Sequence, residues 1–493
     1  MGGIESPVRP PVGGPVPGRV ATFPPTTGIC LGDTPENSMI IALLATAALL
    51  QQEPHDRDSA EVAQLLASLR GADSTVCELA GRALTNFGGF WRGEWSEVPM
   101  PMPMPMPMPT PMPMPFGGAG ISVHPEIHGI HGGRGPDASI LALFRTALRD
   151  SSRCVRHIAV RVVGNARPDW ARDALTALVR ESDGGLRETG ILGLGLIEDL
   201  RSAGAIRDAV RDRDPGVRAV AVWALGQLQL ATSIDLLTRS VDDEVATVRV
   251  RAAWALGRLG DAGSIPGLER AVKDRSPEVR RMAAWSLGQL RFTRGVKALS
   301  AALTDREPEV RKTAIWALSQ IRDGSAAEAV AGRARDPDAT VRSMAAWALG
   351  QREREGSVPA LAQLAKDPSA EVRATALWAL AQIETESAVG PLAEALKDKD
   401  PEVQIMAAWA LGQIRSTTAV RSLGAALKDP DEDVRATAAW ALGQIRSSDA
   451  VPALEGAEND ASPMVRRAVG WALGQIEGER GSGVRMRVRP RIR

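Results

Sequence analysis

The sequence predicts an all-α solenoid in which helical hairpins of 31 residues follow one another along the chain. Three observations lead to this prediction: the 493 residues exceed what one core organises, apolar residues recur with helical spacing, and a tryptophan-centred segment returns at a constant interval. The 59 basic and 59 acidic residues balance, so no overall field attracts nucleic acid. Sequence-specific nucleic-acid binding is therefore not expected.

The tryptophans of the repeated segment stand 31 residues apart without one insertion. They are Trp223, Trp254, Trp285, Trp316, Trp347, Trp378, Trp409, Trp440 and Trp471. Extending this register towards the N-terminus places Leu192 and Arg161 where a tryptophan would stand, which predicts eleven tandem units over residues 137–477. A degenerate twelfth copy is predicted over residues 57–90.

Each unit reads as a helical hairpin. We number a unit from the valine six residues before the tryptophan, so that Val279 is position 0 in the unit of Trp285. Apolar or small residues recur at positions 0, 4, 7 and 8, which is helical spacing. An aspartate five residues earlier, and in several units a proline such as Pro277, indicate a turn followed by a helix start. A second apolar stretch closes the unit, and the hairpin must stack on its neighbours to bury its apolar face.

The segments PEVRRMAAWSLGQL and DVRATAAWALGQIR resemble HEAT repeats of the short, phycobilisome-lyase-like type. The resemblance implies a right-handed superhelix with outer first helices, inner second helices and an Asp/Arg ladder between units. In this sequence the ladder would include Asp274, Arg280, Asp305, Arg311, Asp336, Arg342, Asp367 and Arg373, with an interruption at Gln404. The expected role of this ladder is structural.

The direction of the tryptophans follows from helical geometry. Each residue turns by about 100°, which puts position 6 near 240° and outside the arc of the packing stripe. If the tryptophan helices are the inner helices, as the resemblance implies, nine indoles line a concave groove and offer a binding surface. The alternative is a packing role, in which each indole touches the next unit.

The preferred function is a non-catalytic scaffold or adaptor that binds an extended protein segment along this groove. A polyproline II strand advances about 9 Å in three residues, close to the spacing of the units, and so a Pro-rich segment is the expected partner. The Met-Pro segment Val98–Phe116 is one hypothetical occupant; the other interpretation is a low-complexity spacer. The alternative function is a lyase-like or ligand-binding protein that holds a chromophore or a metal.

Catalytic motifs give no support for an enzyme. The sequence contains no phosphate-binding loop, nucleophile elbow or Ser/His/Asp grouping, and it lacks the paired His-Glu motifs of HEAT-type diiron hydroxylases. No cofactor is expected. Within the low-complexity insertion 91–136, His124, His128 and His131 beside methionine sulfurs would suit Cu(I), and the histidines alone would suit Zn²⁺.

Both ends of the chain differ from the repeats. Residues 1–38 read as a disordered Pro/Gly-rich leader and 39–51 as an apolar helix that resembles a signal-peptide core. The protein would be periplasmic or secreted if Met39 starts a signal peptide, and cytoplasmic otherwise. The Arg-rich tail 478–493 offers an accessory contact to an anionic partner. Cys77 and Cys154 would pair in an exported protein, or else be small core residues.

Overall fold

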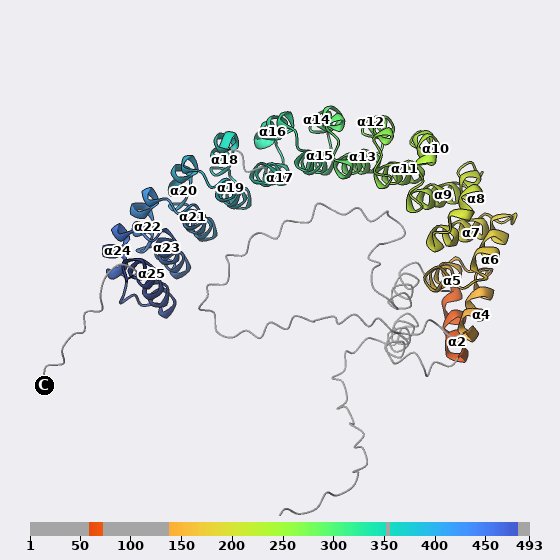
Figure 1. Cartoon of the computed structure of the whole chain (residues 1–493), viewed down its shortest axis with the longest axis horizontal. Helices are drawn as coiled ribbons and strands as arrows, with labels where there is room; N and C mark the ends of the chain where they lie inside the picture. The colour runs from red at the N-terminus through yellow and green to blue at the C-terminus, as the bar shows by residue number, and fades with distance from the viewer. Residues whose placement is uncertain (1–58, 72–137, 352–354, 482–493) are drawn as a thin grey trace, which may run out of the picture. The chain divides into compact units, whose positions relative to one another are not determined.

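The computed structural model describes residues 59–71, 138–351 and 355–481 (Figure 1). The leader, the apolar segment 39–51, the insertion 91–136 and the tail from residue 482 lie outside the described residues. The chain divides into two units, Met1–Gln52 and Glu53–Arg493, and every described residue belongs to the second. Within these residues the regular structure is helical throughout, which confirms the prediction of an all-α solenoid.

Two layers of helices alternate along the array, and the tryptophan helices form the inner layer (Figure 1). The inner helices are α5 (Arg153–Ala166), α7 (Gly184–Ile197), α9 (Pro215–Gln227), α11 (Ala246–Arg258), α13 (Pro277–Leu290), α15 (Pro308–Gln320), α17 (Ala339–Gly350), α19 (Ala370–Ile383), α21 (Pro401–Ile414), α23 (Glu432–Ile445) and α25 (Pro463–Gly481). Consecutive inner helices pack on each other over most of their length.

The outer helices are shorter. They are α4 (Ala138–Ala147), α6 (Ala171–Val179), α8 (Ala203–Ala209), α10 (Ile234–Ser240), α12 (Ile265–Ala271), α14 (Val296–Ala302), α16 (Gly324–Ala331), α18 (Val358–Leu364), α20 (Val389–Ala395), α22 (Val420–Ala426) and α24 (Val451–Glu455). Short 3₁₀ turns accompany most of them: η2 (Leu200–Ser202), η3 (Ala231–Ser233), η4 (Ala262–Ser264), η5 (Thr293–Gly295), η6 (Gly332–Arg335), η7 (Glu355–Ser357), η8 (Glu386–Ala388), η9 (Thr417–Ala419) and η10 (Ser448–Ala450). None of the described helices is long and apolar enough to cross a membrane.

The boundaries of the inner helices follow from local sequence. Pro277 stands at the first turn of α13, where its missing N–H costs no hydrogen bond. After α13, α21 and α23 the chain turns through Arg291, Arg415 and Arg446, whose positive φ angles are 56°, 58° and 56°. Each of these residues donates its main-chain N–H to a leucine carbonyl of the last helical turn, so the inner helix ends abruptly and the chain returns to the outer layer.

The core lies between the two layers. In the unit of α12 and α13, Leu268, Val279 and Ala283 have no exposed surface, and Leu287 is 1% exposed. Val279, Ala283 and Leu287 occupy positions 0, 4 and 8, whose spacing predicts a packing stripe, and Leu268 comes from the outer helix. Because the same positions are buried in the neighbouring units, the core continues along the array as one apolar layer.

Helix α2 (Ser59–Ser68) and the turn η1 (Leu69–Gly71) pack against α4 and α5 at the N-terminal end of the array. Arg70 forms an ion pair with Asp150 at an Nε–Oδ2 distance of 2.9 Å. Cys154, at the start of α5, is disulfide-bonded. Its partner lies outside the described residues, as do the other two cysteines of the chain, Cys30 and Cys77.

Candidate functional site

Arginine side chains of the inner helices join each unit to the next. In α13, Arg280 donates through Nε and Nη2 to the two carboxylate oxygens of Asp305, at 2.6 and 2.8 Å. Its Nη1 donates to the main-chain oxygens of Asp274 and Arg275 in its own loop. The Asp305 carboxylate also accepts the N–H of Glu307. The guanidinium and the carboxylate are therefore both oriented by their own loops before they meet.

The same rung recurs along the array with Nε–Oδ2 distances of 2.6–2.9 Å. The rungs are Arg187–Asp212, Arg218–Asp243, Arg249–Asp274, Arg280–Asp305, Arg311–Asp336, Arg342–Asp367, Arg373–Asp398 and Arg435–Asp460. The ladder residues named from the sequence thus lie together as neighbours across the units.

Electrostatics hold the rungs in their charged form. The hydrogen bond from Arg435 lowers the pKa of the Asp460 carboxyl, and that from Arg187 lowers the pKa of Asp212. For Asp305, partial burial raises the pKa, but the bonds from Arg280 and the Glu307 N–H together outweigh it, so that its pKa also lies below the ordinary value. A carboxylate bound in this way is a poor proton acceptor, which argues for a structural role and against acid–base chemistry.

Gln404 replaces the arginine in α21. Its Nε2 donates to one oxygen of Asp429, at 3.1 Å, and to the Leu396 carbonyl. The rung therefore persists here as a single neutral-to-charged hydrogen bond rather than a bidentate ion pair. Asp398 of the same unit is bound by Arg373 of the preceding one.

The tryptophans lie half-buried or buried on the inner helices. Trp223 and Trp285 are each 8% exposed, and the other seven members of the row are half-buried. The Arg258 guanidinium lies 5.7 Å from the ring centre of Trp254, a cation–π contact. The indole N–H groups of Trp285 and Trp409 are buried and have no hydrogen-bond partner within the described part of the chain.

At five junctions the indole packs against a glycine of the preceding unit. A Cβ atom at Gly412 would lie 2.7 Å from Cζ3 of Trp440, and one at Gly443 would lie 2.6 Å from Cζ3 of Trp471. The same contact joins Gly195 to Trp223, Gly226 to Trp254 and Gly288 to Trp316. The sequence alone does not predict this role for the glycine, although it shares the register of the tryptophan, at position 9 of most units.

One stripe of each inner helix lies on the side opposite the outer layer. In α13 it contains Glu278, Arg281, Trp285 and Gln289, at positions −1, 2, 6 and 10. Residues three or four apart share one face of a helix, and Glu278 and Gln289 are exposed. Stacking of the units places equivalent residues in rows, so the inner face presents an indole row between a row of side chains at position 2 and a row mostly of glutamine.

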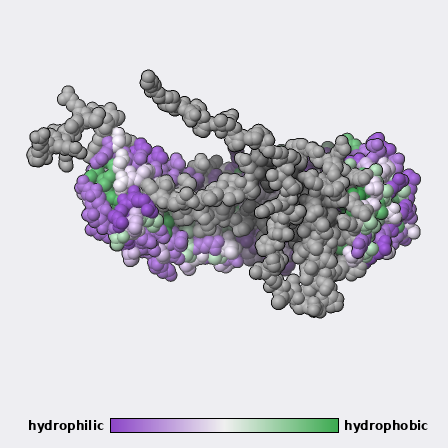
Figure 2. All heavy atoms as spheres, turned by 90° about the horizontal axis from the view of Figure 1, so that it is seen from below, coloured by the Kyte–Doolittle hydropathy of each residue, from purple (hydrophilic) through white to green (hydrophobic). Residues whose placement is uncertain are grey.

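Other candidate features carry less chemistry. His124, His128 and His131 lie outside the described residues. Within the described ranges, no group of three His, Cys, Asp or Glu side chains is placed to hold a metal ion. The described surface in Figure 2 is mostly hydrophilic, and among its residues the large apolar side chains that are exposed are Leu200 and Phe292.

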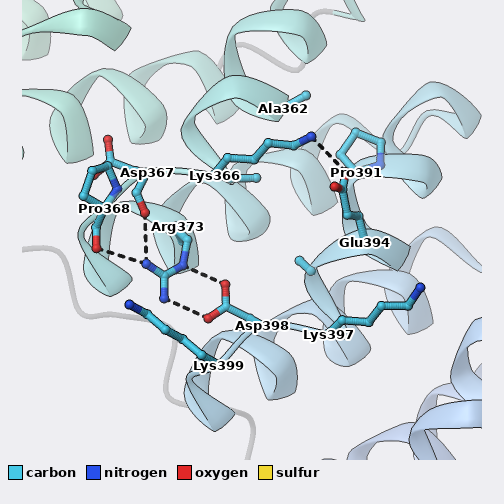
Figure 3. Close-up of a pocket in the computed structure, with 12 residues that line it drawn as sticks. Ala362, Lys366, Asp367, Pro368, Arg373, Pro391, Glu394, Lys397, Asp398 and Lys399 are labelled. Carbon is cyan, nitrogen blue, oxygen red and sulfur yellow. Dashed lines mark hydrogen bonds and ion pairs between the residues drawn. The ribbon is translucent and has the colours of Figure 1, made fainter.

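A pocket of about 620 Å³ lies between the units of α19 and α21, on the side of the loops (Figure 3). Its ionic groups are largely paired: Lys366 with Glu394, and Arg373 with Asp398. Lys397 and Lys399 point away from each other in Figure 3. Since no set of polar groups converges on the cavity, the pocket is a weaker candidate for a binding site than the inner face.

Comparisons with known proteins agree with this geometry. A family model for HEAT repeats matches residues 205–276, 268–350, 329–398, 358–427 and 420–482. No curated protein matches the chain. Among solved structures, the complex in which Kap95p binds RanGDP aligns with 91% of this chain and 65% of that chain, at 13% identity and a TM-score of 0.51, which shows likeness of fold.

Two further solved structures are similar in sequence. An engineered protein is 21% identical over 62% of this chain and 99% of its own, with a TM-score of 0.40. Human deoxyhypusine hydroxylase in complex with glycerol is 27% identical over 50% of this chain and 96% of its own, with a TM-score of 0.24. Both TM-scores are too low to support an argument from structure.

Proposed function

The chain belongs to the HEAT-repeat family, and we propose that it acts as a non-catalytic scaffold that binds an extended protein segment along its inner face. The observation that carries this proposal is the continuous indole row on that face, bordered in the same register by a row mostly of glutamine. Rigid aromatic surfaces with nearby hydrogen-bonding groups are the composition of binding hot spots. The partly buried rings are already ordered by the preceding unit, so binding costs little side-chain entropy.

An extended segment suits this face better than a globular partner. Inner helices pack about 8–10 Å apart, and a polyproline II strand advances about 9 Å in three residues. A segment laid across the helices would therefore present one equivalent side chain to each unit. The long, regular face also contains no convergent acid, base or nucleophile among its described residues, which is the pattern of a binding surface.

Site-specific photo-crosslinking tests this proposal. A photoreactive phenylalanine is placed at Gln413, on the inner face of α21, and in a second variant at Arg421, which is exposed on the outer helix α22. We expect partner protein to be captured from position 413 and not from 421, with the crosslinks confined to one short segment of the partner. Equal capture from the two positions would show that the inner face is not the binding surface.

A further inference from the structure

Five inner helices carry an acidic residue at position −1, and three consecutive ones, α19, α21 and α23, differ from the other two in the residue at position 2. In α19, α21 and α23 this position holds Ala374, Ile405 and Ala436, which are buried. In α13 and α15 the same position holds Arg281 and Lys312. The inner face of α19, α21 and α23 therefore has a shallow, uncharged strip where the face of α13 and α15 has two long cationic side chains.

A row of carboxylates borders this strip. Glu371, Glu402 and Asp433, at position −1, are exposed, and the structure gives them no ion pair within the described residues. In α15, by contrast, the Lys312 Nζ lies 2.6 Å from the Glu309 carboxylate. The helix dipole favours an acidic side chain in the first turn of every inner helix, so the carboxylates alone indicate no ligand. What distinguishes these three units is that the neighbouring cation is missing.

The Asp433 carboxyl lies close to two other acidic side chains. Partial burial, together with the charges of Asp431 and Glu432, raises the pKa of this carboxyl. A cationic group of a bound segment would compensate these charges.

We propose, on the basis of the scaffold function above, that the inner face of α19, α21 and α23 binds an extended protein segment with arginine or lysine at every third residue. Position 2 lies about 4.5 Å along the helix axis from position −1 and about 6 Å from position 6. The main chain of the segment lies over Ala374, Ile405 and Ala436. Its cationic side chains reach Glu371, Glu402 and Asp433 on one side, and the stems of these side chains or the residues between them pack on Trp378, Trp409 and Trp440.

The test is a titration of the full chain with a fluorescein-labelled nonapeptide, Arg-Pro-Pro repeated three times, followed by fluorescence anisotropy. We expect saturable binding that weakens as salt is raised. The variant E371Q/E402Q/D433N removes the three charges at nearly constant shape and is expected to weaken binding at least about tenfold. Unchanged affinity in this variant would overturn the proposal.

Matched controls separate this inference from the scaffold function. The variant E278Q/E309Q changes the same position in α13 and α15 and is expected to bind as the wild type; an equal loss there would contradict the assignment to three units. A peptide with glutamine in place of arginine is expected not to bind. If both peptides bind equally, or neither binds while position 413 still captures a partner, the charge preference is wrong and the scaffold stands.

The Arg-rich tail of the chain is the competing occupant. Binding of the nonapeptide only after removal of residues 482–493 would show that the tail of the chain itself takes the place of the partner, and would overturn the proposal in this form. Circular dichroism of each variant checks that the helices are retained. The variant A374K provides a second route, since a lysine placed on the strip next to Glu371 is expected to reduce binding without removing any carboxylate.

Discussion

The junction between α21 and α23 and the junction between α19 and α21 are built from the same repeat but pack differently. In the first, a Cβ atom at Gly412 would lie 2.7 Å from the Trp440 ring, closer than real Cβ atoms come, and 3.0 Å from the Cα atom of Ala441, a tight contact. In the second, Ala381 has that Cβ atom. The backbones of α19 and α21 are accordingly less closely packed, as are those of α15 and α17, where Ser319 stands in place of the glycine.

The arginine rungs show the complementary pattern. The two loosened junctions keep full rungs, Arg311–Asp336 and Arg373–Asp398, whereas the close junction of Gly412 is the one where Gln404 replaces the arginine. The pocket of about 620 Å³ lies at the junction of Ala381. Two kinds of contact therefore hold the units together, the close glycine packing and the arginine rung. At these three junctions, a weakened contact of one kind is accompanied by a complete contact of the other.

Acid is expected to have the largest effect because it acts on several rungs at once. The pKa values of Asp212 and Asp460 are lowered in the fold, so these carboxylates stabilise it above the ordinary pKa of about 3.9. This stabilisation decreases as the pH falls below that value and is lost below the folded pKa. Hydrogen exchange from about pH 7 to pH 3 should show the helices joined by the rungs Arg187–Asp212 and Arg435–Asp460 losing protection as these carboxylates become protonated. Protection that stays constant down to about pH 3 would contradict a stabilising role of these rungs.

Arg311→Ala is expected to be the most damaging single substitution considered. It leaves the carboxylate of Asp336, whose side chain is 1% exposed, buried without its partner, at a cost of about 3–5 kcal/mol. The matched variant Arg280→Ala acts at the close junction of Gly288 and should cost less. Opening free energies of the flanking helices, from hydrogen exchange, provide the measurement, and equal losses would show that glycine packing does not support the rung.

Gly412→Ala is expected to destabilise the junction of α21 and α23 by about 1–3 kcal/mol, because the new Cβ atom overpacks against Trp440 and the α23 backbone. The control is Gly390→Ala in α20, where no atom lies within 4 Å of the added Cβ. There the better helix propensity of alanine should stabilise by up to about 1 kcal/mol. Denaturant unfolding of both variants decides the sign, and a stabilising Gly412→Ala would remove close packing as the reason for the glycine.

Gln404→Arg should have the smallest effect, a gain of about 1 kcal/mol. It restores a two-bond ion pair to Asp429, whose position matches that of the other rung aspartates. Slower hydrogen exchange in α21 and α23 would report the gain. If exchange there is unchanged, the close glycine junction already supplies all the order that a rung can add.

The repeat could be predicted from the sequence because its signal is local. The spacing of Val279, Ala283 and Leu287 predicts a packing stripe within one helix, and Pro277 predicts its start. The contact of Gly412 with Trp440 could not be predicted in this way, since a helical wheel describes one helix and this contact joins two. The half-buried state of the indoles could not be predicted for the same reason. Their position outside the packing stripe of their own hairpin does not show whether the preceding unit buries them.

The pairing of individual ladder residues could also not be predicted from the sequence. Gln404 was predicted to interrupt the ladder, and the fold shows that its amide still reaches Asp429, because the loop geometry brings the two side chains together whatever their charge. The pairing of Asp398 with Arg373 of the preceding unit gives the ladder its direction, from the helix of one unit to the loop of the next. The spacing in the sequence alone allows each aspartate to pair with the arginine that precedes it or with the one that follows it.

Every rung joins residues 25 apart in sequence, and each guanidinium is already held by the carbonyls of its own loop. The interface between two units is therefore almost independent of how many units lie on either side. Removing or duplicating a stretch of 31 residues between two glycine junctions would create an interface of the same design as those already present. The length of this array can thus change in whole units, and its reach along a partner can change with it.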